Sequence, residues 1–168
     1  MTTLTMKDET RLAMIQRVYR SELTVAVAEQ VIAEIDRDRE GAISQNEASS
    51  YAELLKRDLT PRMDGRKVEL KLTASEFVPP AELRTGSEII QLEFSAAFGP
   101  LAAAPRRLAL ENRHLPEMSV YLINAAQPGF AAVQITRQKR DDNQSAGESD
   151  FTFHPLGQLL GFERCGSC

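Results

Sequence analysis

Four acidic side chains recur at spacings that suit a metal ion in the segment DRDREGAISQNE, residues 36–47. Asp36, Asp38, Glu40 and Glu47 stand at its first, third, fifth and twelfth positions, and Gly41 stands at its sixth. Carboxylate oxygens at such spacings can converge on a hard divalent cation, which prefers oxygen ligands. Glycine permits the positive φ that a sharp turn of the chain requires. The segment therefore predicts a cation site.

The same spacing is typical of the calcium-binding loop of an EF-hand, whose twelve residues supply oxygens from positions 1, 3, 5, 7, 9 and 12. The predicted ligands of a Ca2+ ion, with a main-chain carbonyl at position 7 and a bidentate glutamate at position 12, are Asp36, Asp38, Glu40, Ala42, Ser44 and Glu47. Ile43 at position 8 is expected to anchor the loop to the core.

Two departures from the usual pattern predict modest affinity. Glu40 is one methylene longer than the Asp, Asn or Ser common at position 5, and Arg37 and Arg39 offset part of the carboxylate charge. An alternative interpretation is a degenerate, metal-free loop that keeps the helix-loop-helix shape. A second such loop is not visible, so Ile43 is expected to pack on the β region or on another chain.

The flanking residues predict a helix on each side of the loop. Val27, Val31, Ile32 and Ile35 recur at spacings of three and four ahead of Asp36. After the loop, Ser44 and Glu47 form a capping-box pair, and apolar residues continue at helical spacing to Leu59, with Pro61 ending the helix. Residues 11–23 allow either a strand or a helix.

Beyond Pro61 the apolar period changes from helical to alternating. MDGRKVELKLTA opens with an Asp-Gly turn and alternates Val68, Leu70 and Leu72 with charged residues. SEIIQLEFSAAF, RRLALENRH, MSVYLINAAQ, AAVQITRQKR and SDFTFHP follow as further strands without intervening helices. The predicted fold is α+β: an EF-hand-like helix-loop-helix in an N-terminal segment (1–60), an antiparallel β-sandwich or open barrel (61–156), and a C-terminal tail (157–168).

Composition excludes some function classes. The 168 residues carry a net charge of -4 with a pI near 5.3, which argues against nucleic-acid binding. No apolar run reaches the about 18–20 residues of a membrane span, so direct membrane insertion is not expected, and the N-terminal residues lack the order of a signal peptide. Cys165 and Cys168 lie in the last four residues, where we expect no function.

The order of segments resembles a family. EIDRDREGAISQNEASSYAELLKRDL, MDGRKVELKL, LRTG, LENRHLPEMSVYLINA and ITRQKRDDNQ are similar to the extracytoplasmic N-terminal region of bacterial membrane proteins related to the HupE/UreJ family, over about residues 5–155. The resemblance implies a periplasmic domain with one EF-hand-like loop, and a membrane protein or a membrane portion of the same protein as partner. Nickel or cobalt handling is not carried over, because no His or Cys cluster would serve those ions.

These observations predict a non-enzymatic calcium-binding domain whose metal is structural or presents a surface to a partner. Two alternatives stay open. One is a β interaction module with a metal-free loop. The other is an enzyme that uses His114, with Glu111 and Glu117 nearby, or His154, although a lone histidine at a strand end is more often a hydrogen-bonded structural residue.

Overall fold

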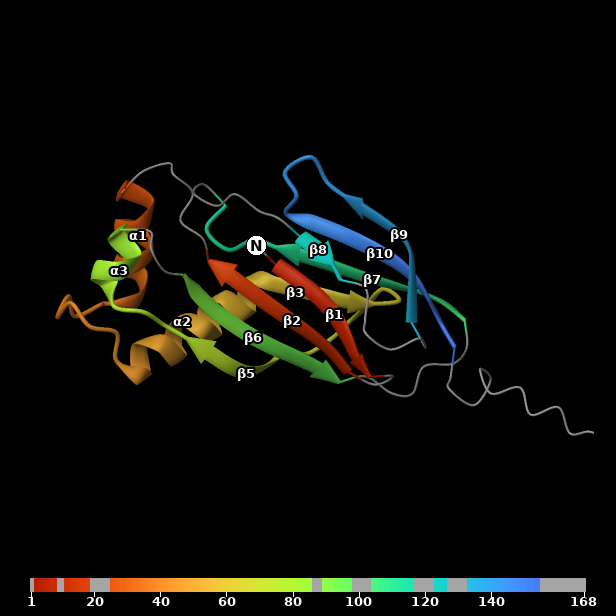
Figure 1. Cartoon of the computed structure of the whole chain (residues 1–168), viewed down its shortest axis with the longest axis horizontal. Helices are drawn as coiled ribbons and strands as arrows, with labels where there is room; N and C mark the ends of the chain where they lie inside the picture. The colour runs from red at the N-terminus through yellow and green to blue at the C-terminus, as the bar shows by residue number, and fades with distance from the viewer. Residues whose placement is uncertain are drawn as a thin grey trace, which may run out of the picture.

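The computed structural model describes residues 2–8, 11–18, 25–85, 89–97, 104–116, 123–126 and 133–154. Within these ranges the chain forms two five-stranded sheets and three helices (Figure 1). One sheet, in the order β5-β6-β2-β1-β8, contains β1 (Thr2–Asp8), β2 (Arg11–Val18), β5 (Lys71–Glu76), β6 (Ile90–Ala97) and β8 (Ile123–Ala125). The other, in the order β4-β3-β7-β10-β9, contains β3 (Leu59–Met63), β4 (Arg66–Lys67), β7 (Pro105–Asn112), β9 (Val133–Arg140) and β10 (Ala146–Phe153).

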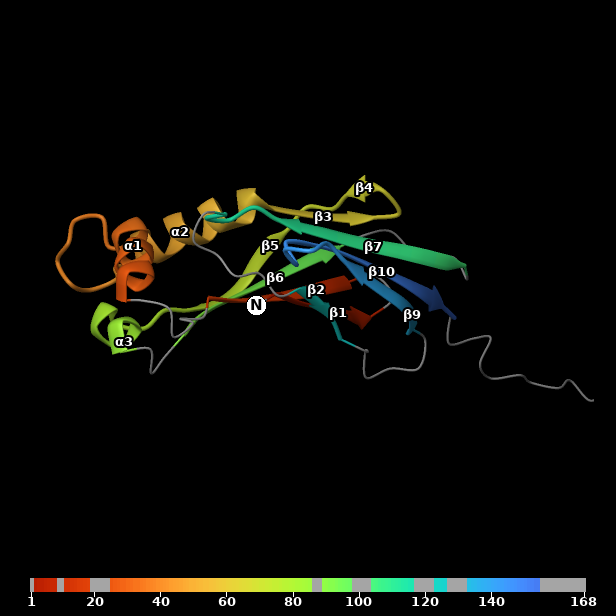
Figure 2. The ribbon, with the colours of Figure 1, turned by 90° about the horizontal axis from the view of Figure 1, so that it is seen from above.

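The two sheets lie face to face, and the helices gather at one end of this sandwich (Figure 2). Described strand pairs are antiparallel, apart from β1 with β8, which is parallel. The α+β fold with a sandwich of antiparallel sheets, as predicted from the alternating apolar pattern, is therefore confirmed. Strands β1 and β2, from the predicted N-terminal segment, pair with β8 and β6, so the two predicted regions share a sheet.

Alternation along the strands builds the core. In β6, Ile90, Leu92 and Phe94 are at most 1% exposed, while the residues between them are only partly buried. Successive side chains of a strand point to opposite faces, so these three point toward the facing sheet. Phe151 and Phe153 of β10 do the same from the other sheet. Burial of each such side chain stabilises the fold by about 1.5–3 kcal/mol.

Helices α1 (Val25–Ile35) and α2 (Gln45–Asp58) flank the acidic loop, as the periodicity predicts. Val31, Ile32 and Ile35 of α1 belong to the same core as Tyr51 and Leu55 of α2. The described part of the 11–23 segment is β2, so the strand alternative was the right one.

Three local predictions were wrong. MDGRKVELKLTA, predicted as one strand, contains β4 and the start of β5, because the chain crosses from one sheet to the other at residues 68–70. The predicted strand region contains a helix, α3 (Pro80–Thr85), because Pro80 suits the first helical position and the residues after it are good helix formers. The second loop helix ends at Asp58, and Leu59 begins strand β3, where pairing with Asn112 of β7 replaces the helical pattern. The C-terminal tail, with Cys165 and Cys168, lies outside the described residues.

Strand β8 joins the two sheets at one corner of the sandwich. The side-chain amide of Gln138 donates to the carbonyl of Ala125 (2.8 Å) and accepts from its N–H (3.4 Å), and Arg140 Nε donates to the carbonyl of Ile123. Gly147 of β10 leaves room for this approach, since a Cβ there would lie 3.0 Å from Cγ2 of Ile123. Side chains of β9 thus cover main-chain groups on the edge of β8, an edge that would otherwise be open to another strand.

We expect Gln138→Ala to lower the free energy of unfolding by about 1 kcal/mol, because it removes two hydrogen bonds to a strand edge. Urea denaturation with Gln134→Ala as control measures this, since Gln134 is exposed on the same strand. Equal, negligible losses in both variants would show that water replaces the Gln138 amide without cost.

Candidate metal centre

The acidic loop begins at the buried end of α1. Ile35 is 1% exposed and Asp36, which follows it, is 4% exposed. The Asp36 N–H still donates to the carbonyl of Ile32 (2.7 Å), so the helix holds the start of the loop in place. The Asp36 carboxylate accepts from the N–H groups of Glu40 (3.1 Å) and Gly41 (3.0 Å). These bonds fix the first predicted ligand and fold the loop over it.

Two residues of the loop have positive φ. Gly41 has φ 83°, as expected for the turn at position 6. Arg39 has φ 61°, which the loop pattern does not predict. A side chain in this left-handed region costs about 1–2 kcal/mol relative to the right-handed one. The loop therefore contains strain at position 4, and the N–H bonds to Asp36 help to hold that conformation.

The end of the loop is the start of α2, where the predicted capping box is present. Ser44 is the N-cap, its hydroxyl accepts from the Glu47 N–H (3.3 Å), and Glu47 Oε2 accepts from the Ser44 N–H (3.0 Å) and hydroxyl (2.7 Å). Glu47 Oε1 accepts from the N–H of Arg37 (2.8 Å), across the loop. These bonds, with the Ser44 hydroxyl contributing most, lower the pKa of Glu47 from its usual 4.5.

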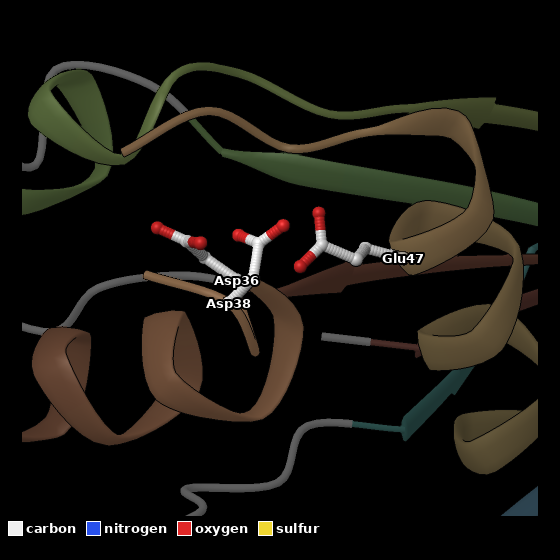
Figure 3. Close-up of side chains that lie close together, drawn as sticks. All are labelled: Asp36, Asp38 and Glu47. Carbon is white, nitrogen blue, oxygen red and sulfur yellow. The ribbon is translucent and has the colours of Figure 1, made fainter. Parts of the chain in front are cut away.

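Three of the predicted acidic ligands come together. Asp36, Asp38 and Glu47 each offer a carboxylate oxygen, and these oxygens lie within 4.8 Å of one another (Figure 3). Asp36 and Asp38 extend from the chain after α1, and Glu47 extends toward them from the first turn of α2. Mutually repelling carboxylates at this separation gain from a cation placed between them.

The remaining predicted ligands are not part of this carboxylate cluster. Among the described acidic, His and Cys side chains, the Glu40 carboxylate does not belong to this cluster of three. Its main-chain N–H donates to the carboxylates of Asp36 and Asp38. Ala42 and Ser44 lie in the same loop, and the Ser44 hydroxyl donates a hydrogen bond to the Glu47 carboxylate. Among the four acidic residues of the pattern, Glu40 is thus the one whose carboxylate is not grouped with the other three.

Neighbouring elements hold the loop and its helices. Ile43 is partly buried and packs against the common core, as expected for position 8. Arg84 of α3 binds Glu29 of α1 through two contacts of 2.7 and 3.2 Å. The Glu29 carboxylate raises the pKa of Arg84, and the charge of Asp36 adds to this effect. Helix α1 is therefore tied to α3 close to the acidic loop.

His114, the predicted centre of the enzyme alternative, is 6% exposed and hydrogen-bonded through both ring nitrogens. Its Nδ1 lies 2.8 Å from Oδ2 of Asp58, and its Nε2 lies 3.0 Å from the hydroxyl of Tyr51. A carboxylate can only accept, so Nδ1 carries the proton that faces Asp58, and in the neutral imidazole Nε2 accepts from the Tyr51 hydroxyl. Burial, with the negative charges of Glu34 and Asp58, raises the pKa of Tyr51.

This arrangement is that of a structural histidine. Tyr51 and Asp58 are seven residues apart on α2, hence on one face, and His114 follows β7, so the three residues join α2 to the second sheet. Asn112, also buried, accepts from the His114 N–H (3.0 Å). The helical spacing of Tyr51 and Asp58 was visible in the sequence, but their common partner was not.

The other residues of the enzyme alternative do not join His114 in the described structure. Glu111 binds Arg113 (2.6 Å), and His154 is exposed after β10. Glu117 lies outside the described residues.

Comparison with known proteins adds no relative: no family model, curated protein or solved structure matches the chain. The resemblance to HupE/UreJ-related proteins therefore stays a prediction. Among the described residues, no helix combines the length and apolar character needed to cross a membrane.

Tyr51→Phe tests the contact between α2 and His114. The ring still fills its site, but a buried nitrogen loses the hydroxyl that it faces, so we expect the free energy of unfolding to fall by about 1–3 kcal/mol. Urea denaturation in EDTA measures the loss, and His154→Ala, at an exposed histidine, should be close to wild type. A loss no larger than that of His154→Ala would contradict a structural role for the Tyr51 hydroxyl.

The lowered pKa of Glu47 predicts a dependence of stability on pH. A carboxyl whose pKa is lower in the folded than in the unfolded state stabilises the fold above its unfolded value, near 4.5, and this contribution is lost as pH falls through the folded value. In EDTA, wild type should therefore lose more stability than Glu47→Gln between pH 6 and pH 3. The comparison cancels the similar effects of Glu29, Asp141 and Asp150, which both proteins retain. Parallel curves would contradict the assignment.

Proposed function

We propose that this protein is a calcium-binding domain with a single EF-hand-like loop, in which the ion has a structural role. The observation that carries the proposal is the convergence of Asp36, Asp38 and Glu47, at positions 1, 3 and 12 of the loop, to within 4.8 Å. The loop has the glycine turn, the anchor residue and the flanking helices that the pattern requires. An all-oxygen set without His or Cys suits a hard cation such as calcium.

The hydrogen bonds of Glu47 favour modest affinity. Both of its oxygens already accept from Arg37 or Ser44, so bidentate binding has to compete with these bonds. Arg37 and Arg39 add positive charge to the same loop. Calcium sites of extracellular modules have Kd values of about 0.1–1 mM, and a site of this strength would be filled outside the cytoplasm. The periplasmic location that the resemblance implies is part of this proposal.

The packing around the loop favours a structural role over a sensor role. A sensor EF-hand opens by moving one helix away from the other. Here α2 is held to the second sheet through Tyr51, Asp58 and His114, and α1 is held to α3 through Glu29 and Arg84. A bound ion would therefore join two helices that contacts outside the loop already hold in place.

A thermal melt of the full chain tests the proposal in EDTA, in calcium and in magnesium. At ten times Kd, bound calcium should add about 1.4 kcal/mol of stability, or ~3–6 °C in Tm for a domain of this size. Magnesium should have a smaller effect, because it needs near-ideal octahedral geometry.

Glu47→Gln should abolish the calcium response while keeping the fold, since glutamine also completes a capping box. Asp142→Asn, an equal loss of charge on the exposed β9–β10 turn, should retain it. Equal responses in both variants would indicate a nonspecific charge effect. A folded protein that neither contains metal nor responds to calcium would instead support a metal-free loop on a β interaction module.

A further inference from the structure

The outer face of the second sheet contains a hollow of about 350 Å³ that the metal site does not explain. It lies over β3, β7, β10 and β9, on the side of this sheet that faces away from the sandwich core. The outward side chains at its centre are two alanines, Ala109 and Ala146, on adjacent strands. In Figure 2 no described helix or strand covers this face of the sheet. A volume of this size falls in the range of small-molecule sites.

Strand register places opposite charges on either side of one alanine. Arg62 of β3 and Glu148 of β10 are both direct cross-strand neighbours of Ala109 of β7. The two flanking strands are about 10 Å apart, since neighbouring strands are separated by ~4.8 Å. Arg62 and Glu148 form no ion pair with each other within 4.0 Å among the described residues. The small side chain between them leaves a gap with a cation on one side and a carboxylate on the other.

These two side chains make few polar contacts within the described part of the protein. Arg62 donates to the carbonyl of Gly65 at 3.3 Å, and the nearest ion-pair partner of Glu148 is Arg107, at 4.0 Å. Lys139, opposite Glu148 on β9, makes no ion pair in the described part of the chain. Glu111, by contrast, is held by Arg113. Charge is therefore available on both sides of Ala109 for a ligand.

The balance of charge selects the ligand class. Three of the charged lining residues, Arg140, Glu111 and Asp141, bind Ile123, Arg113 and Ser145. A simple anion would still meet Glu148 and a simple cation would meet Arg62 and Lys139, and like charges repel. A molecule that carries both an ammonium and a carboxylate satisfies both sides of the gap.

We propose that this hollow binds a small zwitterion, an amino acid or a short peptide, whose carboxylate pairs with Arg62 and whose ammonium pairs with Glu148 above Ala109. The bidentate guanidinium suits a carboxylate. The site is on the sandwich, on elements other than the acidic loop, so binding does not require the metal.

The experiment is an NMR titration of the full 15N-labelled chain with glycine, diglycine and triglycine, in EDTA and again in calcium. We expect millimolar binding, with shifts on β3, β7 and β10, and no shifts with N-acetylglycine amide, which lacks both charges. Preference for glycine assigns free amino acids and preference for triglycine assigns peptides. Absence of shifts at about 20 mM, where a Kd of ~1 mM would saturate the site, would overturn the proposal.

Three variants locate the binding. Ala109→Gln fills the hollow with an outward side chain and should abolish the shifts, while Arg62→Gln and Glu148→Gln should each weaken binding about 5- to 10-fold. Arg66→Gln is the matched control, because Arg66 is exposed on the neighbouring strand β4 and does not line the hollow. Binding that persists in Ala109→Gln, or that weakens equally in Arg66→Gln, would overturn the assignment.

Discussion

Helix α2 is the element on which the rest of the arrangement depends, because hydrogen bonds hold it at both ends. At its start, Glu47 accepts from main-chain groups on both sides of the acidic loop, so the loop is closed onto the helix. Tyr51 in the middle of the helix and Asp58 at its end meet His114, which follows β7. The face between them is buried, with Leu55 fully inaccessible. The position of the twelfth loop residue is therefore set by the sandwich as well as by the loop.

This connection explains how the acidic loop is held in a structure whose described residues contain no second loop of this kind. EF-hands commonly rely on a paired loop through position 8, and here Ile43 packs instead on the core that the helices share with the sheets. The Asp36 carboxylate is buried, and its two N–H bonds offset part of the cost of removing a charge from water. The positive φ of Arg39 adds strain. The ends of the loop are held by α1 and by α2, and α2 is bonded to His114 beside the second sheet.

The predictable parts of the structure are those whose cause is local in sequence. The capping box of Ser44 and Glu47 was predicted and found, and the Asp64-Gly65 turn has positive φ at both residues, as a tight hairpin between β3 and β4 requires. The strand character of SEIIQLEFSAAF predicted β6. The partners of the strands were not predictable, because nothing in residues 2–8 specifies parallel pairing with β8, more than a hundred residues later. The contact of His114 with α2 could not be predicted for the same reason, because Tyr51 and Asp58 are distant from His114 in the sequence.

The local pattern also misled where tertiary contacts outweighed it. Leu59 continues the helical spacing of α2, but its main chain pairs with Asn112 as the first residue of β3. At the loop, Glu40 stays a predicted ligand, and its main-chain N–H donates to the carboxylates of Asp36 and Asp38. A sequence motif specifies which groups are present, and the surrounding packing decides which of them meet. For this loop the packing brings together the two aspartates and the helix-start glutamate, so a bound ion would link the chain after α1 directly to the helix that His114 fixes to the sandwich.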